Sequence, residues 1–161
     1  MIKILTTREL KRQDIFQICN LKNTYWRFSL DKQIQWFQKN IKNNDIHFCY
    51  FKRRNIVAYN SLRKSYFIFK EKKKIFYLFD TFLIHKDFRK IGLAKKMMNQ
   101  NLKLLKKSKK IGFLLCQKKH INFYKKLKWK YLKNQNYKLN IFKKKKLHIM
   151  FINFSKLNFN N

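Results

Sequence analysis

The chain has 161 residues, enough for one domain with a substantial core and too few for two domains of ordinary size. Hydrophobic residues make up 45% and aromatic residues 17%, which excludes intrinsic disorder as the main state despite the heavy charge. Lys and Arg number 41 against 7 Asp and Glu, a net charge of +34, so charge alone would favour nucleic acid or an anionic membrane as partner.

Composition drift offers a second explanation for this charge. Lys far outnumbers Arg, Asn, Ile and Phe are abundant, Ala and Gly occur twice each and Pro is absent, which is the profile of a genome rich in A and T. Arg, the residue best suited to bidentate contacts with phosphates and bases, is scarce. We therefore expect no specific nucleic-acid partner, and whether the charge has a function stays open.

The cysteines and the apolar runs indicate the cellular compartment in which we expect the chain. Cys19, Cys49 and Cys116 are widely spaced and show no zinc-binding pattern, so we expect reduced core cysteines and no metal. The best apolar run, Ile75–Ile84, contains Asp80 and is too short for a transmembrane segment. The first residues lack the apolar centre of a signal peptide, so a cytoplasmic location is expected.

The first third of the chain is predicted to form one strand and two helices. Thr6 and Glu9 have the spacing of a capping box, and apolar residues then recur at helical spacing. In chain order we expect the strand Ile2–Thr6, a helical stretch from Leu10 to Cys19, the loop Asn20–Ser29, the helix Leu30–Ile41 and the turn Lys42–Asp45.

In the middle of the chain, segments rich in aromatic and β-branched residues predict three consecutive antiparallel strands. These strands are Ile46–Phe51, Ile56–Arg63 and Ile75–Ile84, with the basic clusters Lys52–Asn55 and Lys70–Lys74 as the turns between them. The lysines of these turns are expected to be solvated and to form no binding patch.

The last part alternates helices and strands. We expect the loop His85–Ile91, the helix Gly92–Lys107, the strand Ile111–Cys116, a short helix from Ile121 to Leu127, and the strands Trp129–Leu132 and Leu147–Phe154. No repeat and no linker is visible, so residues 1–161 are expected to form a single α/β domain.

The strand, loop and helix of residues 75–107 form the most informative local feature. The N–H groups at a helix N-terminus are unsatisfied and lie at the positive end of the helix dipole, so they bind phosphates well. Gly92 and Ala94 provide small side chains at this point, in a chain that has almost none elsewhere. This pattern predicts a phosphate-binding loop.

Two motifs resemble those of a known family. The run from Phe82 to Ala94 resembles motif A of the GCN5-related N-acetyltransferases (GNAT), whose core is (Arg/Gln)-x-x-Gly-x-(Gly/Ala). The run from Phe123 to Trp129 resembles the Tyr-Glu-Lys-Leu-Gly-Phe segment of the same family, and the order of elements agrees. The resemblance implies a GNAT fold of the α/β (α+β) class, with a mixed, mostly antiparallel sheet of about six or seven strands and about four helices.

The resemblance implies an N-acetyltransferase with acetyl-CoA as co-substrate. The backbone of the fourth strand would pair with the pantetheine arm, and N–H groups of the loop would surround the pyrophosphate, with Arg89 and Lys90 adding charge. The implied cofactor-binding residues are Leu83, Ile84, Arg89, Lys90, Ile91, Gly92, Leu93, Ala94, Lys95 and Gln117.

The resemblance also implies catalytic groups. Tyr124 aligns with the tyrosine that protonates the departing thiolate, a role suited to a phenol. Asp80 is the only acid in the fourth strand and is a candidate for taking the amine proton, directly or through water; pairing with a neighbouring lysine is the alternative reading. His85 and His120 are weaker candidates.

Three positions depart from the family pattern. Lys90 replaces the usual first glycine of the loop, Lys86 replaces a common proline, and Lys128 replaces the glycine that ends the helix. None of these removes a group that the chemistry requires, although Lys128 leaves the end of the helix uncertain.

The acceptor pocket of this fold is shaped by the first two helices and the loop between them. Tyr25, Trp26 and Arg27 are the candidate substrate-binding residues, with aromatic rings to stack on a sugar or nucleotide and a guanidinium to meet a phosphate, whereas Trp36 is expected to pack in the core. The stretch Gln33–Phe48 resembles members that modify amino sugars, so an amino-sugar nucleotide is the leading acceptor.

Several alternatives stay open. A protein N-terminus or lysine is the second acceptor candidate. A basic nucleic-acid-binding module and a catalytically inactive GNAT-like module are the readings that involve no enzyme, and a homodimer is possible for any of them.

Overall fold

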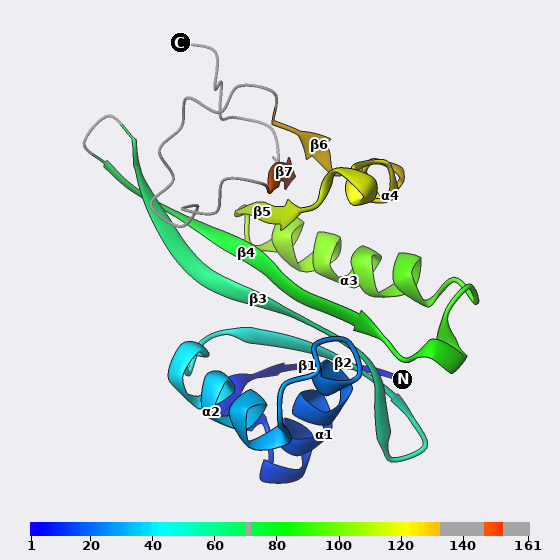
Figure 1. Ribbon diagram of the computed structural model, residues 1–161. Coiled ribbons are helices and arrows are strands. Elements are labelled where there is room, and N and C mark those ends of the chain that lie inside the picture. Colours follow the sequence, from blue (N-terminus) through cyan, green and yellow to red (C-terminus); the bar gives the residue numbers. More distant parts are fainter. Residues whose placement is uncertain (70–71, 133–146, 153–161) are drawn as a thin grey trace. The chain divides into compact units, whose positions relative to one another are not determined.

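The computed structural model describes residues 1–69, 72–132 and 147–152. Its elements, labelled in Figure 1, are β1 (Ile2–Thr6), η1 (Thr7–Glu9), α1 (Arg12–Asn23), α2 (Leu30–Asn40), β2 (Ile46–Lys52), β3 (Asn55–Phe69), β4 (Lys72–Ile84), η2 (Lys86–Phe88), α3 (Leu93–Lys107), β5 (Ile111–Cys116), η3 (Lys118–His120), α4 (Ile121–Lys126), β6 (Lys130–Tyr131) and β7 (His148–Ile152). The strands form a seven-stranded sheet in the order β1-β2-β3-β4-β5-β7-β6.

The chain forms two compact units, each with its own hydrophobic core. Unit 1 comprises Met1–Arg63 and Asp80–Asn101, and unit 2 comprises Lys64–Phe79 and Leu102–Asn161. The predicted fold class is confirmed: the sheet is mixed and carries four α-helices in the described part of the chain. That residues 1–161 make a single domain stays a prediction.

In unit 1, helices cover both faces of an antiparallel sheet. β1 pairs with β2 from Ile2↔Tyr50 to Thr6↔Ile46, and β2 pairs with β3. Side chains from α1 and α2 share a core with Tyr59 of β3. The next residue, Asn60, must point to the opposite face, where it meets Asn101 of α3. Figure 1 shows α1 and α2 together on one side of these strands.

Local signals explain where the first elements begin. The capping box predicted at Thr6 and Glu9 is confirmed, with the Thr6 N–H donating to Glu9 Oε2 at 2.6 Å. It starts the short η1 turn, and α1 begins after it at Arg12. α2 begins after Ser29, whose hydroxyl oxygen accepts from the Lys32 N–H.

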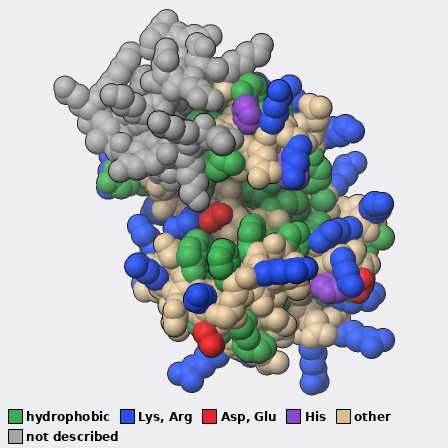
Figure 2. Space-filling model, in the orientation of Figure 1, with side chains coloured by type: hydrophobic (Ala, Val, Ile, Leu, Met, Phe, Trp, Pro, Cys, Tyr) green, Lys and Arg blue, Asp and Glu red, His purple; other side chains and the backbone are tan. Residues whose placement is uncertain are grey.

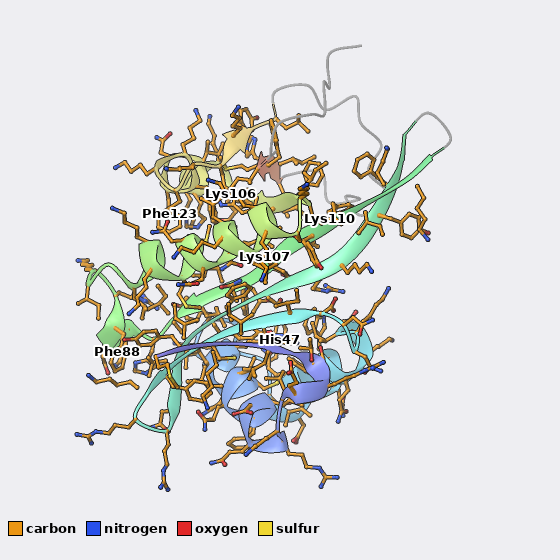
Figure 3. The ribbon with its side chains drawn as sticks, turned by 180° about the vertical axis from the view of Figure 1, so that it is seen from behind. His47, Phe88, Lys106, Lys107, Lys110 and Phe123 are labelled. Atoms are coloured by element: carbon orange, nitrogen blue, oxygen red, sulfur yellow. The ribbon has the colours of Figure 1, made fainter. Side chains whose placement is uncertain are left out.

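In unit 2, aromatic side chains dominate the core. β4 pairs in parallel with β5 from Phe76↔Ile111 to Phe79↔Leu114, and β7 lies antiparallel between β5 and β6. Phe76 and Phe113 meet edge to face with ring centroids 5.1 Å apart. Gly112 lets the core close: a Cβ there would lie 2.8 Å from Leu105 Cδ1. Lys106 and Lys107 lie in the last turn of α3, where positive charge is favoured by the helix dipole, and Lys110 follows the helix (Figure 3).

Three predicted boundaries are wrong. The loop predicted from Asn20 begins too early, because α1 continues to Asn23 and buries Leu21 and Lys22. The strand predicted to end at Arg63 continues to Phe69, and β4 begins at Lys72, so Lys72–Lys74, predicted as part of a turn, belong to a strand. Residues 70–71 of that predicted turn lie outside the described residues. Polar residues suggested ends that tertiary packing overrides. The strand expected at Leu147–Phe154 is β7, and its residues 153–154 lie outside the described residues.

The three cysteines are free and buried, as predicted. Burial raises the pKa of the thiol to about 11 for Cys19 and to about 12 for Cys49, and it raises that of Cys116 as well. These thiols therefore stay protonated and act as small apolar core residues.

Basic side chains are spread widely over the face drawn in Figure 2, and acidic ones are few. This spread agrees with a charge that comes from overall composition, because a dedicated polyanion site gathers its cations into one stripe or patch. Across the described residues, no helix is long and apolar enough to cross a membrane.

Candidate functional site

Unit 1 contains a pocket of about 430 Å³ between the first two helices and the second half of β4. Aromatic side chains and a few polar groups make up its wall, which is typical of sites for small molecules. The lining residues are Lys22, Trp26, Phe28, Lys32, Gln33, Trp36, Asp80 and Thr81. Tyr25, Trp26, Phe28 and Trp36 are also among the most exposed aromatic residues of the described chain.

β4 has an irregular backbone at Thr81, a residue that lines the pocket. Thr81 has φ +54°, a left-handed conformation that costs a β-branched residue about 1–2 kcal/mol. Such strain concentrates at functional sites, where the surrounding structure holds it in place.

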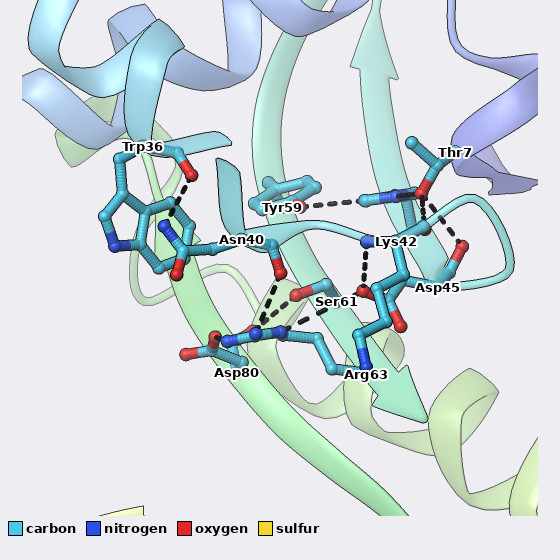
Figure 4. A network of polar contacts seen from close by, with 10 residues as sticks. Thr7, Trp36, Asn40, Lys42, Asp45, Tyr59, Ser61, Arg63 and Asp80 are labelled. Atoms are coloured by element: carbon cyan, nitrogen blue, oxygen red, sulfur yellow. Dashed lines mark hydrogen bonds and ion pairs between the residues drawn. The ribbon is translucent and has the colours of Figure 1, made fainter. Parts of the chain in front are cut away.

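Arg63 of β3 holds Asp80 beside this point (Figure 4). Its Nη1 lies 3.1 Å from Asp80 Oδ2, its Nη2 donates to the Asn40 carbonyl at 2.9 Å, and its Nε lies 3.9 Å from Asp45 Oδ2. The carboxylate of Asp80 is therefore both a wall of the pocket and one half of an ion pair. Its partner is an arginine, and sequence reasoning did not identify it.

Lys22 is the unusual residue of the pocket wall. Its side chain is 5% exposed, and its Nζ lies 3.7 Å from the centroid of the Trp36 ring. Burial lowers the pKa of the Lys22 ammonium, and the nearby Asp80 carboxylate opposes that change. On the same wall, Gln33 is fixed by donating to the Trp26 carbonyl at 3.1 Å.

At the end of β4, the backbone of Ile84 faces away from β3. The N–H of the next residue, His85, donates to the Val57 carbonyl of β3 at 2.8 Å, and backbone groups of successive strand residues point to opposite edges. By the same alternation the groups of Leu83 face β3, and its side chain is buried in the core.

Tyr25 occupies this outward edge. Its hydroxyl accepts from the Ile84 N–H at 3.1 Å and donates to the Ile84 carbonyl. Arg89 donates to the same carbonyl from its Nε at 3.1 Å, and its guanidinium lies 5.0 Å from the centre of the Tyr25 ring. Three residues predicted for the site are therefore in mutual contact within unit 1.

The loop after β4 has the geometry of an anion site. Lys90 has φ +63° and Gly92 has φ +77°, so two residues have a left-handed backbone conformation before α3 begins. Apart from the adjoining residues of the chain, nothing lies within 4 Å of where a Gly92 Cβ would be, so the space in front of the loop is open. The first N–H groups of α3 belong to Leu93, Ala94 and Lys95. No preceding helical turn exists whose carbonyl groups could accept from them.

The charges around this loop suit an anion. The first turn of α3 contains no acid and carries Lys95 and Lys96, which lie at the positive end of the helix dipole, where cations are unfavourable. A bound phosphate would remove that conflict. The Arg89 N–H is already used, because it donates to the Lys86 carbonyl at 3.3 Å, so the backbone donors begin after Arg89.

Tyr124 and Gln117 belong to unit 2. The Tyr124 ring packs edge-on against Phe79 and Trp129. Burial raises the pKa of its hydroxyl, and Cys116 adds to that effect, so the phenol is protonated at neutral pH. Gln117 is exposed and precedes η3.

Lys128 adopts the conformation that the usual glycine would adopt. Its φ is +70°, and the N–H of the following Trp129 donates back to the Tyr124 carbonyl at 3.1 Å. The end of α4, in doubt from the sequence, is therefore a glycine-type cap made by a lysine.

The remaining candidates are placed as follows. Arg27 is exposed and does not line the pocket, whereas Trp26 does. The expectation that Trp36 packs in the core is wrong, because Trp36 is 37% exposed and forms part of the pocket wall. His85 Nδ1 lies 3.5 Å from Asp87 Oδ2 at the surface, and His120 is exposed.

Sequence reasoning missed Lys22, Lys32, Gln33 and Thr81. One signal was present for Lys22, because it continues the helical spacing of Ile18 and Cys19 and therefore lies on a buried face. A lysine on an apolar stripe is rare enough to mark a site.

A mixed sheet whose fourth strand leads into an open, glycine-containing loop at a helix N-terminus is suited to bind a phosphate-bearing cosubstrate. Residues 13–129 match the family model described as Acetyltransferase (GNAT) family, so the chain belongs to this family and is an acyltransferase. Its members use acetyl-CoA for N-acetylation.

Solved structures agree on the fold. ElaA of Escherichia coli has a TM-score of 0.68 and 15% identity, covering 94% of this chain and 97% of its own. A GNAT-family acetyltransferase of Staphylococcus aureus Mu50 has a TM-score of 0.66 and 15% identity, with 94% and 98% covered. The PaiA N-acetyltransferase of Thermoplasma acidophilum, solved with coenzyme A, has a TM-score of 0.60 and 14% identity, with 96% and 99% covered. No curated protein sequence matches the chain.

Proposed function

We propose that this protein transfers the acetyl group of acetyl-CoA to a primary amine of a small molecule held in the pocket of unit 1. The observation that supports this proposal is the succession of features along one stretch of unit 1. Asp80 and Thr81 line the pocket, Ile84 presents its backbone at the strand edge, and the anion loop follows from Lys90 to Gly92.

In the proposed reaction, the neutral amine attacks the thioester carbonyl. A C–N bond forms, the C–S bond breaks, the nitrogen loses a proton and the departing thiolate gains one. Because Arg63 neutralises the charge of Asp80, we assign Asp80 to orienting the amine and to passing the proton of the amine to water. Tyr124, protonated at rest, is the proposed donor to the thiolate.

Each part of the anion loop has a proposed partner on acetyl-CoA. The N–H groups of Ile91, Gly92, Leu93, Ala94 and Lys95, with the side chains of Arg89 and Lys90, would hold the pyrophosphate. Ile84 and Gln117 are retained as candidates along the pantetheine arm, and Leu83 only as the residue that precedes Ile84, because its backbone groups face β3 and its side chain is buried. Because the Tyr25 hydroxyl already bonds both backbone groups of Ile84, strand-like pairing there requires Tyr25 to leave.

The acceptor that we propose first is an amino-sugar nucleotide, with a protein N-terminus or lysine as the second candidate. A pocket of about 430 Å³ with aromatic walls supports a small molecule, because a protein substrate needs an open groove for its flanking residues. Buried, protonated thiols support a reducing compartment such as the cytoplasm.

Calorimetry with acetyl-CoA tests the proposed function. We expect binding with a micromolar Kd, and loss of binding by at least about 100-fold in Gly92→Glu, because the carboxylate would stand where the pyrophosphate binds. Gly92→Ala is the matched control: it strains the same φ without a charge and has open space for its methyl group, so it should bind more weakly than wild type yet measurably.

Thermal unfolding of the same variants shows whether they remain folded. A wild-type protein that does not bind acetyl-CoA would overturn the proposed function. Binding that survives in Gly92→Glu would remove the anion loop from the site.

A further inference from the structure

The pocket of unit 1 presents more positive than negative charge. Lys22 and Lys32 line it, and Asp80 is its single acid. Arg63 already pairs with the Asp80 carboxylate, so little of that negative charge is left for a ligand. A polyamine or another cation without an anionic group would therefore meet repulsion on entering.

Lys22 contributes most to this asymmetry because it is buried. Its side chain is 5% exposed, and in the described part of the chain no carboxylate lies within ion-pair distance of its Nζ. A buried ammonium is unfavourable unless an opposite charge or hydrogen-bond acceptors surround it. The Trp36 ring, 3.7 Å from Nζ, satisfies one side of the cation through its π face.

Among the described residues, the Lys22 ammonium lacks a charged partner on the side of the pocket. Lys22 is on the pocket wall, between the Trp36 face and the Asp80 side. Apolar packing alone does not explain a lysine here, because a Met or Leu would continue the apolar stripe of α1 without the desolvation penalty. Its position is explained if an anion enters the pocket.

We propose that Lys22 binds a carboxylate or phosphate carried by the acceptor, so that the enzyme acetylates amines that are also anions. This inference rests on the proposed function and narrows its substrate class. Trp26 and Trp36 hold the flat or apolar part of the acceptor, Lys22 fixes the anionic group, and Asp80 meets the amine at the other side. Lys32, exposed at the pocket, adds a weaker attraction.

Pairs of amines that differ in the anionic group test the inference. Tryptophan is compared with tryptamine, and glucosamine 6-phosphate is compared with glucosamine. Spermidine is included as a polycation. The rate of thiol release from acetyl-CoA is measured for each amine. For at least one pair, we expect the anionic member to have the higher kcat/KM by about 10–100-fold, the size of a charge-assisted hydrogen bond.

Three lysine variants separate Lys22 from the general charge. Lys22→Met keeps the stem and should remove most of that preference, and Lys22→Glu should reverse it. Lys39→Met is the matched control: Lys39 is an exposed lysine on α2 that does not line the pocket, so the preference should persist. Thermal unfolding confirms that the variants are folded.

Binding provides a readout that is independent of turnover. Trp26 and Trp36 line the pocket, so glucosamine 6-phosphate, an anionic amine that does not itself fluoresce, should change the tryptophan fluorescence on entering, and Lys22→Met should weaken that change. The inference is overturned if cationic amines are preferred, if Lys22→Met keeps the wild-type ratio, or if acetyl-CoA binds while no anionic amine is turned over or changes the fluorescence. Failure to bind acetyl-CoA would instead overturn the proposed function.

Discussion

Unit 1 and unit 2 bury different kinds of side chain. Unit 1 contains all the buried polar side chains of the described residues, namely Lys22, Gln33, Asp45, His47, Asn60, Ser61 and Asn101. The described part of unit 2 buries apolar side chains, with aromatic rings such as Phe76, Phe113 and Trp129 at the centre. The two units are therefore stabilised by different interactions.

Apart from Lys22, these polar side chains have hydrogen-bond partners within unit 1. Asn60 and Asn101 exchange two amide hydrogen bonds of 2.8 and 3.1 Å between β3 and α3. Arg63 joins Asp80 to the end of α2. Such networks fix side chains in one geometry, which a pocket needs, but they depend on protonation state. The apolar core of unit 2 is insensitive to pH and sensitive to volume.

Acid should therefore weaken the protein mainly through unit 1, and His47 gives the largest expected effect. His47 is fully buried among the strands of unit 1 (Figure 3). The Thr7 hydroxyl donates to the Lys42 carbonyl and so accepts from His47 Nε2 at 2.8 Å, which leaves Nδ1 to accept from the Tyr59 hydroxyl. The neutral ring is fully satisfied.

Burial lowers the pKa of His47 from 6.5 to about 4. Between these values the unfolded chain binds the proton and the folded protein does not, so stability is complete above pH 6.5 and falls until about pH 4. We expect a loss of about 3 kcal/mol in the free energy of unfolding over this window, measured by urea unfolding at several pH values.

His47→Gln is the control for this pH dependence. It removes the titrating ring and should flatten the curve between pH 6.5 and 4, even if it lowers stability at neutral pH. A variant that keeps the full slope would show that groups other than His47 carry the acid sensitivity.

Tyr124 belongs to the apolar unit 2 and is the proposed proton donor of the reaction. Tyr124→Phe keeps the ring packing against Phe79 and Trp129 and removes the hydroxyl. We expect turnover to fall about 100-fold with the Kd for acetyl-CoA unchanged, because general acid catalysis contributes at least that factor. Steady-state kinetics and calorimetry measure the two quantities.

Tyr131→Phe is the matched control in unit 2. Its hydroxyl contacts His148 Nδ1 at 2.9 Å and has no assigned role in the reaction, so turnover should not change. Unchanged turnover in Tyr124→Phe would remove Tyr124 from the proton-donor role.

Much of the fold could be predicted because its signals are local. β1 was predicted with its observed bounds, and the helix after Ser29 with its observed start, because alternation and capping lie within a few neighbouring residues. Two of the failures share a cause. Lys22 was expected in a loop and Arg63 at the end of a strand, whereas α1 continues through the buried Lys22 and β3 continues past Arg63.

The site divides in the same way. The anion loop is one continuous segment, so its glycine, its charges and the following helix were visible in the sequence. The pocket brings Lys22 and Trp36 together with Asp80, residues separated by more than forty positions, and no local pattern reports that contact. The placement of Tyr25 against Ile84 was likewise invisible.

Tyr25→Phe tests whether the polar contacts of unit 1 also regulate cofactor binding. Without the hydroxyl, nothing from Tyr25 competes for the N–H and carbonyl of Ile84. We expect acetyl-CoA to bind about 3–10-fold more tightly by calorimetry, since each net hydrogen bond is worth about 0.5–1.5 kcal/mol. Tyr66→Phe, an exposed tyrosine of unit 2, should leave the Kd unchanged. Weaker binding in Tyr25→Phe would mean that the hydroxyl contacts the bound cofactor.

The smallest effect concerns backbone strain, which should not distinguish the units. Lys90 of unit 1 and Lys128 of unit 2 both have positive φ values, +63° and +70°, where glycine is favoured. Lys90→Gly and Lys128→Gly should each stabilise the protein by about 1 kcal/mol and raise the Tm by about 2–4 °C. Lys125→Gly, within α4, should lower it by a similar amount. Equal gains would show that strain is local and independent of the neighbouring core; a gain only at Lys128 would mean that Lys90 stabilises the loop through its side chain.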